Sequence, residues 1–216
     1  MFIKIINDDI AREISGSLLD ISAIKLSIQK PFKWSSGWNS PIYCDNRLSL
    51  SYPDLRSKIK AYLCLGIQGY FPGTDVIAGV ATAGIPQGAL VAEELGLPFI
   101  YVRSKPKGHG MENMIEGAVS PGQRVVLIED LISTGGSSLK AAQALRDAGC
   151  EVQGIGAIFT YGFEMAEQNF KEANVPAFCL SQYSMLIDHA IEKEYVKETE
   201  KISLESWRES PSTWNN

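Results

Sequence analysis

The sequence lacks the residue patterns of a disulfide-linked, zinc-binding or membrane-spanning protein. Its four cysteines lie far apart and form no CxxC pair; they are Cys44, Cys64, Cys150 and Cys179. This spacing argues against a zinc site and a disulfide framework, and it predicts reduced thiols. The longest weakly polar run, VIAGVATAGI, is far too short to cross a bilayer, and the N-terminus has no apolar core of signal-peptide length. We therefore expect a cytoplasmic protein with no membrane partner.

Positive charge is also scarce. Lys and Arg number 20 against 25 Asp and Glu, which gives a formal net charge of −5. This balance disfavours broad electrostatic binding to nucleic acid, so no nucleic-acid partner is expected. The sequence contains no Gly-Lys dipeptide, which excludes the GxxxxGK[ST] motif, and no GxGxxG follows a predicted strand. With 216 residues, 45% of them apolar, the chain is expected to form one domain over residues 1–216.

Helix and strand patterns alternate along the chain. Asn7 can cap a first helix with apolar positions at Ile10, Ile14, Leu18, Leu19 and Ile24. Buried strands are predicted at 76–81, 99–103, 124–130, 152–161 and 176–181, and further helices at 54–68, 86–95, 136–148, 163–173 and 182–193. Residues 103–117 show no helical or strand periodicity of apolar residues, and this segment is predicted to be a long mobile loop. Alternation of this kind implies a mostly parallel sheet that binds ligands beyond the carboxyl ends of its strands.

The stretch VVLIEDLISTGGSSLK, residues 125–140, combines groups that suit ligands of opposite charge. Glu129 and Asp130 end a buried strand, where carboxylates are costly without partners. The turn that follows can bind an anion through its main-chain N–H groups, because Gly135 and Gly136 permit unusual backbone angles. A glycine-containing turn with a serine cap is the simpler alternative, but it does not explain the acids. Carboxylates accept hydrogen bonds from sugar hydroxyls, so the pattern indicates a sugar phosphate.

This stretch resembles the signature of the type I phosphoribosyltransferases, in which four apolar residues precede two acids and a hydroxyl- and glycine-containing loop. The resemblance implies an α/β fold, with a mostly parallel central sheet, helices on both faces and a small N-terminal hood from about residues 1–50. It also implies that the segment binds the ribose 5-phosphate of phosphoribosyl pyrophosphate (PRPP), with the acids at the ribose hydroxyls. The residues assigned to PRPP in this way are Glu129, Asp130, Leu131, Ile132, Ser133, Thr134, Gly135, Gly136 and Ser137.

A second segment, YVRSKPKGHG, gathers basic residues on a glycine-rich stretch without periodicity. A solvated basic run is the ordinary explanation. However, these cations occur in an acidic protein, and they could neutralise the charge that grows on a departing diphosphate. The segment resembles the flexible catalytic loop of the orotate phosphoribosyltransferases, an Arg…Lys-x-His-Gly pattern. The resemblance makes Arg103, Lys107 and His109 catalytic and PRPP-binding residues. It also implies a homodimer in which this loop reaches into the neighbouring subunit's site.

Two other segments extend the resemblance. GVATAGIP, residues 79–86, can present main-chain N–H groups to a pyrophosphate, although tight helix–sheet packing explains its small residues nearly as well. WSSGWNSPIYCDNR resembles the SGxxSP-x-Y segment that covers the base in the orotate family, and Trp38 and Arg47 are its weakly marked features. Within the PRPP motif, Ser133 is the residue whose counterpart contacts orotate.

The chain departs from the family pattern at four positions. Ser35, Ala83 and Ser104 stand where some members have lysine, and Tyr161 stands where some have arginine. The chain therefore fits a subgroup that lacks the lysine at the position of Ser35 and the arginine at the position of Tyr161. How the carboxylate of orotate is held stays open.

The resemblance also implies a reaction and its cofactor. N1 of orotate displaces pyrophosphate from Mg²⁺-bound PRPP and gives orotidine 5′-monophosphate, a step of de novo UMP biosynthesis. Because Mg²⁺ is expected to be held by substrate oxygens and water, no metal-ligating residues are assigned. A phosphoribosyltransferase for a purine or another base is one alternative. A non-catalytic PRPP-sensing regulator is another, although no basic recognition helix supports it. His189 is assigned to the surface or to packing.

Overall fold

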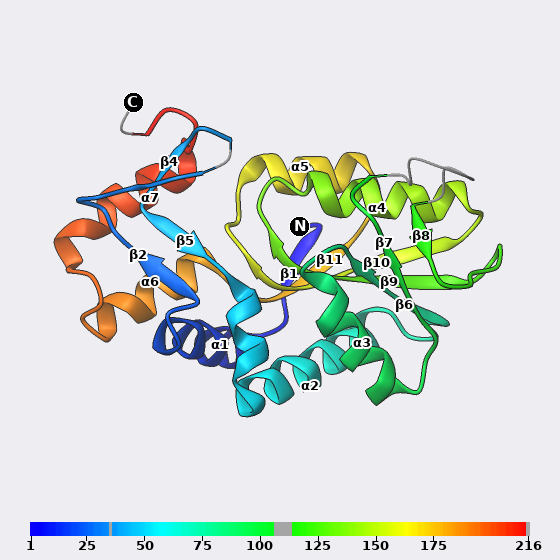
Figure 1. The fold of residues 1–216 in the computed structure, drawn as a ribbon. Coiled ribbons are helices and arrows are strands. Elements are labelled where there is room, and N and C mark those ends of the chain that lie inside the picture. The colour runs from blue at the N-terminus through cyan, green and yellow to red at the C-terminus, as the bar shows by residue number, and fades with distance from the viewer. Residues whose placement is uncertain (35, 106–113, 215–216) are drawn as a thin grey trace.

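The computed structural model describes residues 1–34, 36–105 and 114–214, and a seven-stranded sheet lies at its centre (Figure 1). The strand order is β1-β11-β10-β9-β6-β7-β8, and every pairing is parallel except β7 with β8. The strands are β1 Ile3–Ile5, β6 Val76–Val80, β7 Phe99–Val102, β8 Ile115–Glu116, β9 Arg124–Ile132, β10 Glu151–Thr160 and β11 Ala177–Gln182. The predicted mostly parallel sheet is confirmed.

Helices cover both faces of this sheet, as expected when strands alternate with helices. Figure 1 shows α4 and α5 over one face and α2 and α3 over the other. Their bounds are α1 Asp8–Asp20, α2 Pro53–Tyr70, α3 Gly84–Leu95, α4 Gly136–Asp147, α5 Glu164–Glu172, α6 Tyr183–Glu192 and α7 Lys201–Glu209, with 3₁₀ helices η1 Asn46–Ser51 and η2 Glu198–Glu200. No helix among the described residues is long and apolar enough to span a bilayer.

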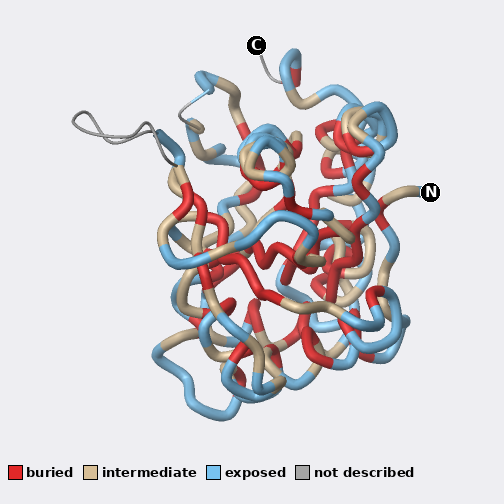
Figure 2. The backbone as a smooth tube through the Cα atoms, turned by 90° about the vertical axis from the view of Figure 1, so that its right-hand side faces the viewer, coloured by how far each residue is buried: buried red, intermediate tan, exposed pale blue. Residues whose placement is uncertain are grey.

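The central strands form the core, because they are buried on both faces. Val125 to Ile128 of β9 are fully buried, which explains why this strand shows no alternation of apolar and polar residues. Figure 2 shows the buried stretches running through the middle of the molecule, with exposed segments around them. The helix α3 lies very close to β9: there is no room for a Cβ atom at Gly84, which would overlap the main-chain oxygen of Ile128.

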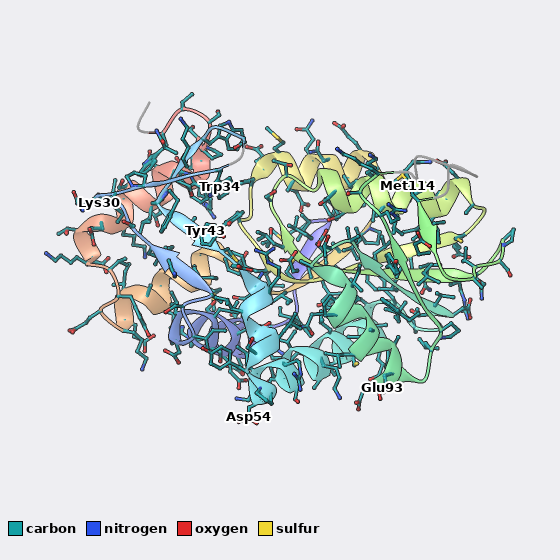
Figure 3. The ribbon with its side chains drawn as sticks, in the orientation of Figure 1. Lys30, Trp34, Tyr43, Asp54, Glu93 and Met114 are labelled. Carbon is teal, nitrogen blue, oxygen red and sulfur yellow. The ribbon has the colours of Figure 1, made fainter. Side chains whose placement is uncertain are left out.

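A second group of short strands lies beside the main sheet and corresponds to the expected hood. They are β2 Ile24–Leu26, β3 Phe32–Lys33, β4 Asn39–Ser40 and β5 Ile42–Cys44, paired antiparallel as β2 with β5 and β3 with β4. Figure 1 shows these strands close to α6 and α7, so segments from both ends of the chain meet there. Trp34, labelled in Figure 3, follows β3 on the side of the hood that faces the main sheet.

Three sequence-based assignments were wrong or incomplete. Ile24 does not belong to the first helix, since α1 ends at Asp20 and Ile24 begins β2. The short strand β1 was not predicted, although it pairs with β11 at the edge of the sheet. The predicted loop over 103–117 contains β8, which pairs antiparallel with β7.

Candidate functional site

The acid pair lies at the carboxyl end of β9, at the rim where ligands of parallel sheets bind. The sequence predicts that this strand ends at residue 130, but β9 continues to Ile132. Leu131 and Ile132 are therefore strand residues and not part of the loop. Ser133, Thr134 and Gly135 then lead directly into α4.

Glu129 is only 5% exposed, and its carboxyl group is hydrogen-bonded within the chain. The hydroxyl of Ser138 donates to Oε2 at 3.1 Å, and that of Ser137 lies 3.4 Å from the same atom. The main-chain N–H of Asp130 donates to Oε1 at 3.1 Å. These bonds supply the partners that a buried carboxyl group needs. Ser138 was not singled out from the sequence, because an ordinary helix would equally place a serine there.

The surroundings of the two acids favour their neutral forms. Burial, and then the charge of Asp130, raises the pKa of Glu129 to about 8. Burial also raises the pKa of Asp130 above its ordinary value. At neutral pH Glu129 therefore keeps its proton, and the pair carries less than two negative charges. A reduced charge lets an acid pair lie beside a phosphate-binding loop, because like charges then repel less.

The loop after β9 is shaped to expose the start of α4. Gly135 has a φ of +84°, and a Cβ atom there would overlap the ring of Phe170. Its neighbour Thr134 is fixed by Asn169, whose Nδ2 donates to the Thr134 main-chain oxygen at 3.0 Å. No side chain caps α4. Uncapped N–H groups at a helix N-terminus favour an anion such as phosphate.

The segment 79–86 joins β6 to α3 next to the acid pair. A Cβ atom at Gly79 would lie 2.8 Å from Ile85 Cα, and Gly84 packs against Ile128, the residue before Glu129. The explanation of these small residues by tight helix–sheet packing is thus confirmed. Ala81 is held by a 2.9 Å hydrogen bond from its N–H to the main-chain oxygen of Val102. Binding of pyrophosphate by this loop stays a prediction.

Arg103 lies at the base of the basic segment, directly after β7. Its main-chain N–H donates to the oxygen of Met114 at 2.8 Å, and its guanidinium lies 3.3 Å from Glu116. A cavity of about 270 Å³ brings this residue together with the other loops; among its lining residues are Ala81, Arg103, Ser137 and Lys140. Lys140 also donates to the main-chain oxygen of Ser104 at 3.0 Å, a role that the sequence did not reveal. Lys107 and His109 lie outside the described residues.

The hood is tied to the acid pair by Asn46. Its Nδ2 donates a 2.7 Å hydrogen bond to the main-chain oxygen of Asp130, and the side chain is 1% exposed. Arg47, which the sequence singled out, instead forms an exposed 2.6 Å ion pair with Asp45. Trp38 is half-buried in the turn before β4.

The main-chain N–H of Tyr161 donates to the oxygen of Ile132 at 3.2 Å. This bond places the Tyr161 backbone next to Ser133, the residue that follows Ile132. Tyr161 is 2% exposed, and its ring packs against Trp34 of the hood with centroids 5.1 Å apart. Burial is the main reason why the pKa of its hydroxyl is well above the ordinary value. The side chain at this position is thus a neutral phenol. Ser35 lies outside the described residues.

His189, in the last turn of α6, packs against α1, as expected for a packing residue. A Cβ atom at Gly16 would lie 2.7 Å from its Nε2.

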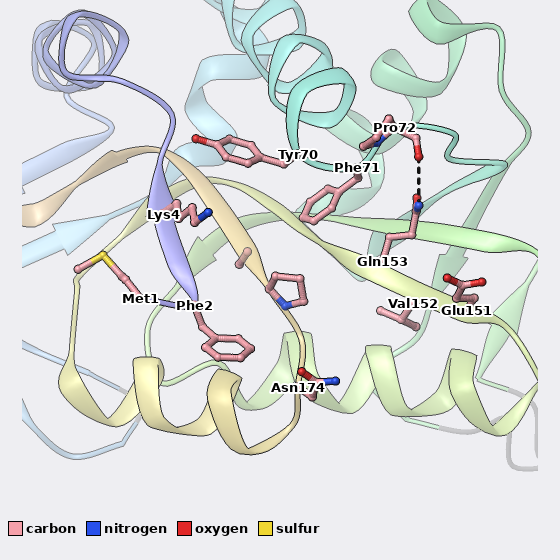
Figure 4. Close-up of a pocket in the computed structure, with 12 residues that line it drawn as sticks. Met1, Phe2, Lys4, Tyr70, Phe71, Pro72, Glu151, Val152, Gln153 and Asn174 are labelled. Carbon is pink, nitrogen blue, oxygen red and sulfur yellow. Dashed lines mark hydrogen bonds between the residues drawn. The ribbon is translucent and has the colours of Figure 1, made fainter.

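A cavity of about 660 Å³ lies away from this rim, at the amino ends of β10 and β11 (Figure 4). Gln153 lines this cavity, and its Nε2 donates a hydrogen bond to the main-chain oxygen of Pro72 at 3.3 Å. Lys4 lies over the ring of Tyr70, 5.6 Å from its centroid. None of the acid, hydroxyl and basic groups described above lines it. The cavity at the rim is smaller, but Arg103, Ser137 and Lys140 line it.

The chain is similar to known phosphoribosyltransferases. Residues 60–183 match the phosphoribosyl transferase domain. An orotate phosphoribosyltransferase of Cytophaga hutchinsonii is 54% identical over 203 residues, which cover 94% of this chain and 97% of that protein. One from Bacillus caldolyticus is 52% identical, with coverage of 94% and 98%.

Solved structures show the same architecture. The orotate phosphoribosyltransferase of Aeropyrum pernix superposes with a TM-score of 0.73 at 28% identity, covering 85% of this chain and 99% of that one. The UMP synthase of Leishmania donovani gives a TM-score of 0.77 at 25% identity, covering 92% of this chain and 42% of that one.

Proposed function

The chain belongs to the orotate phosphoribosyltransferase family, and from this premise we propose that it transfers ribose 5-phosphate from PRPP to N1 of orotate. The products are orotidine 5′-monophosphate and pyrophosphate, in de novo UMP biosynthesis. The observation that carries the proposal is the acid pair Glu129–Asp130 near the carboxyl end of β9, followed after residues 131–135 by the uncapped N-terminus of α4. Ribose hydroxyls and a 5′-phosphate need these two groups side by side.

The phosphate and ribose of PRPP bind along the end of β9 and the loop after it. Main-chain N–H groups and hydroxyls of residues 133–137 hold the 5′-phosphate. Asp130 accepts hydrogen bonds from the ribose hydroxyls, while Glu129 is itself held by Ser138. Cleavage of the glycosidic bond develops positive charge on the ribose. Negative charge on Asp130 stabilises that charge, because the two lie close together in a site of reduced polarity.

The diphosphate leaves from the side of the cavity that Arg103 lines. Negative charge grows on it as the bond breaks, and Arg103, Lys107 and His109 neutralise that charge. Closure of the basic segment excludes water, which would otherwise hydrolyse PRPP. Lys140 supports this segment by its hydrogen bond to Ser104.

Mg²⁺ is the proposed cofactor. Among the described residues, no three His, Cys, Asp or Glu side chains gather as a metal site. The two rim carboxyl groups are nevertheless oxygen donors of the kind that suits Mg²⁺, which typically uses one or two carboxylates together with substrate oxygens and water. Bound with PRPP, the ion supplies positive charge to the diphosphate. Asp130 would face the ion or the ribose hydroxyls beside it, with Glu129 as its hydrogen-bonded neighbour.

Orotate is proposed to lie between Ser133 and the hood. The hood reaches this place through Asn46, and Tyr161 and Trp34 form the wall next to it. Because Tyr161 replaces a cation, the carboxylate of orotate is held by neutral donors such as the Ser133 hydroxyl.

We propose further that residues 1–216 act as one domain, as a homodimer that shares the basic segment across subunits. The four unpaired cysteines support a reducing compartment, the cytoplasm.

The test measures pyrophosphate release from PRPP and Mg²⁺ with orotate, uracil, adenine, hypoxanthine and xanthine supplied separately. We expect release with orotate alone. Release with a purine instead would keep the PRPP site and overturn the assignment of the base. Binding of PRPP without release with any base would indicate a PRPP sensor and overturn the proposed activity.

A further inference from the structure

Trp207 of the C-terminal helix α7 is fully buried, and it lies outside residues 60–183 that match the phosphoribosyl transferase domain. Its indole Nε1 donates a 3.2 Å hydrogen bond to the main-chain oxygen of Asn39 in hood strand β4. Its ring packs edge-on against Trp34 and Tyr161, with centroids 5.5 Å away in each case. The C-terminal helix therefore contacts the hood and the rim of the main sheet through one side chain.

The hairpin that Trp207 holds cannot keep its geometry alone. Strands β3 and β4 have two residues each and pair only as Phe32 with Ser40 and Lys33 with Asn39. An isolated two-stranded pair is at best marginally stable in water, so packing must fix its position. Among the described residues, the hydrogen bond from Trp207 is one such fixed point. The ring packing of Trp34, which follows β3, is another.

The same ring also fixes the wall of the proposed base site. Tyr161 follows β10 and lies beside Ser133, as the hydrogen bond from its N–H to Ile132 shows. Trp34 packs on Tyr161 from the hood, and Trp207 packs on both rings. Phe163 and Tyr183 complete the cluster around Trp207 at 5.4 and 5.2 Å. Displacement of this indole would move the hood hairpin and Tyr161 together.

We propose that Trp207 is a positioning residue of the orotate subsite, so that the C-terminal helix takes part in base binding without contacting the base. This inference rests on the proposed function. The phosphate loop and the acid pair are held by hydrogen bonds of Asn169, Ser138 and Asn46, and none of these bonds involves Trp207. A defect at Trp207 should therefore affect orotate more than PRPP.

The test compares Trp207→Phe, Trp207→Leu and the wild-type protein by their KM values for orotate and for PRPP. The Phe variant loses the bond to Asn39 but keeps an aromatic ring, and the Leu variant loses both. We expect KM for orotate to rise roughly tenfold in Trp207→Leu and by less in Trp207→Phe, with KM for PRPP within about twofold. KM does not depend on the folded fraction, so partial unfolding alone cannot produce this split.

The matched control is Phe178→Leu. Phe178 is a buried ring that packs on Tyr70 and Phe71 near the amino end of β11, the end of the strand away from the rim. We expect this variant to lose stability with both KM values unchanged. If the Trp207 variants changed both KM values equally, or changed neither, the inference would be wrong while the proposed function would stand. Wild-type protein that does not use orotate would instead overturn the proposed function and the inference with it.

Discussion

Asn46 and Asp130 are joined by a 2.7 Å hydrogen bond from the Asn46 amide to the main-chain oxygen of Asp130. The two residues are separated by 84 positions in the sequence, and they connect the hood to the rim of the main sheet. Asp130 is the acid proposed to face the ribose. The hood is therefore attached to the strand end that is proposed to bind PRPP, by a hydrogen bond that does not involve Trp207.

Replacement of Asn46 by Ala should weaken both the fold and the site. The variant leaves the main-chain oxygen of Asp130 without its partner, and we expect the free energy of unfolding to fall by about 1–3 kcal/mol. Urea unfolding measures this change, and steady-state kinetics should show a raised KM for orotate. The control is Arg47→Ala, which removes only the exposed pair with Asp45, expected to be worth about 0–1 kcal/mol. Equal losses in the two variants would contradict this assignment.

The central strands, and the position of the acid pair and the glycine turn at one rim of the sheet, could be predicted from the sequence because their signals are local. The apolar run before Glu129 and the glycines after it lie within one short stretch. The hood attachments could not be predicted, since Asn46 has no signal beyond its place in a turn. Trp207 contacts Asn39 across 168 positions, which no local pattern encodes. The strand β1 was missed because it has three residues and depends on its pairing with β11.

The raised pKa of Glu129 predicts a specific dependence of stability on pH. The folded protein holds this proton up to about pH 8, whereas an unfolded glutamate releases it near its ordinary pKa of 4.5. The stabilising contribution is thus complete below the unfolded pKa and is lost as pH rises through the folded one. Across this window unfolding releases a proton, so stability falls with pH by up to about 1.4 kcal/mol per unit.

Glu129→Gln tests this dependence, because the amide keeps the shape of the side chain and cannot ionise. We expect the wild-type protein to lose stability between about pH 5 and pH 8, and the variant to lose less. Urea unfolding at several pH values within this range measures both slopes. A wild-type curve parallel to that of the variant would show that Glu129 does not hold the proton.

Gly84 should not tolerate a side chain, since a Cβ atom would overlap the main-chain oxygen of Ile128. We expect Gly84→Ala to destabilise the protein by about 1–3 kcal/mol and to lower activity, because α3 is pushed away from the strand that carries Glu129. The matched control is Gly69→Ala in α2, where nothing lies within 4 Å of the added atom. There the substitution should stabilise by about 1 kcal/mol. Thermal unfolding should show a lower melting temperature than wild type for Gly84→Ala and a higher one for Gly69→Ala.

Lys107 is expected to act on the leaving diphosphate and not on the fold. In Lys107→Ala we expect turnover to fall by about 10²–10³-fold, as for loss of a donor that stabilises developing charge. The control is Lys193→Ala, which removes an exposed lysine at the end of α6. Turnover and thermal unfolding are measured for both proteins. Unchanged turnover in folded Lys107→Ala would exclude this residue from the mechanism.

Sharing of the basic segment between subunits can be tested by mixing two impaired variants. Lys107→Ala has an impaired basic segment and an intact acid pair, whereas Asp130→Asn has the reverse. If the segment acts in the neighbouring subunit, a mixed dimer contains one site with both native residues. Random pairing of equal amounts should then restore about a quarter of the wild-type activity, after unfolding and refolding the two chains together. If the segment acts within its own subunit, every site in the mixture keeps one defect. The mixture would then show only the average of the two separate activities, and the shared arrangement would be wrong.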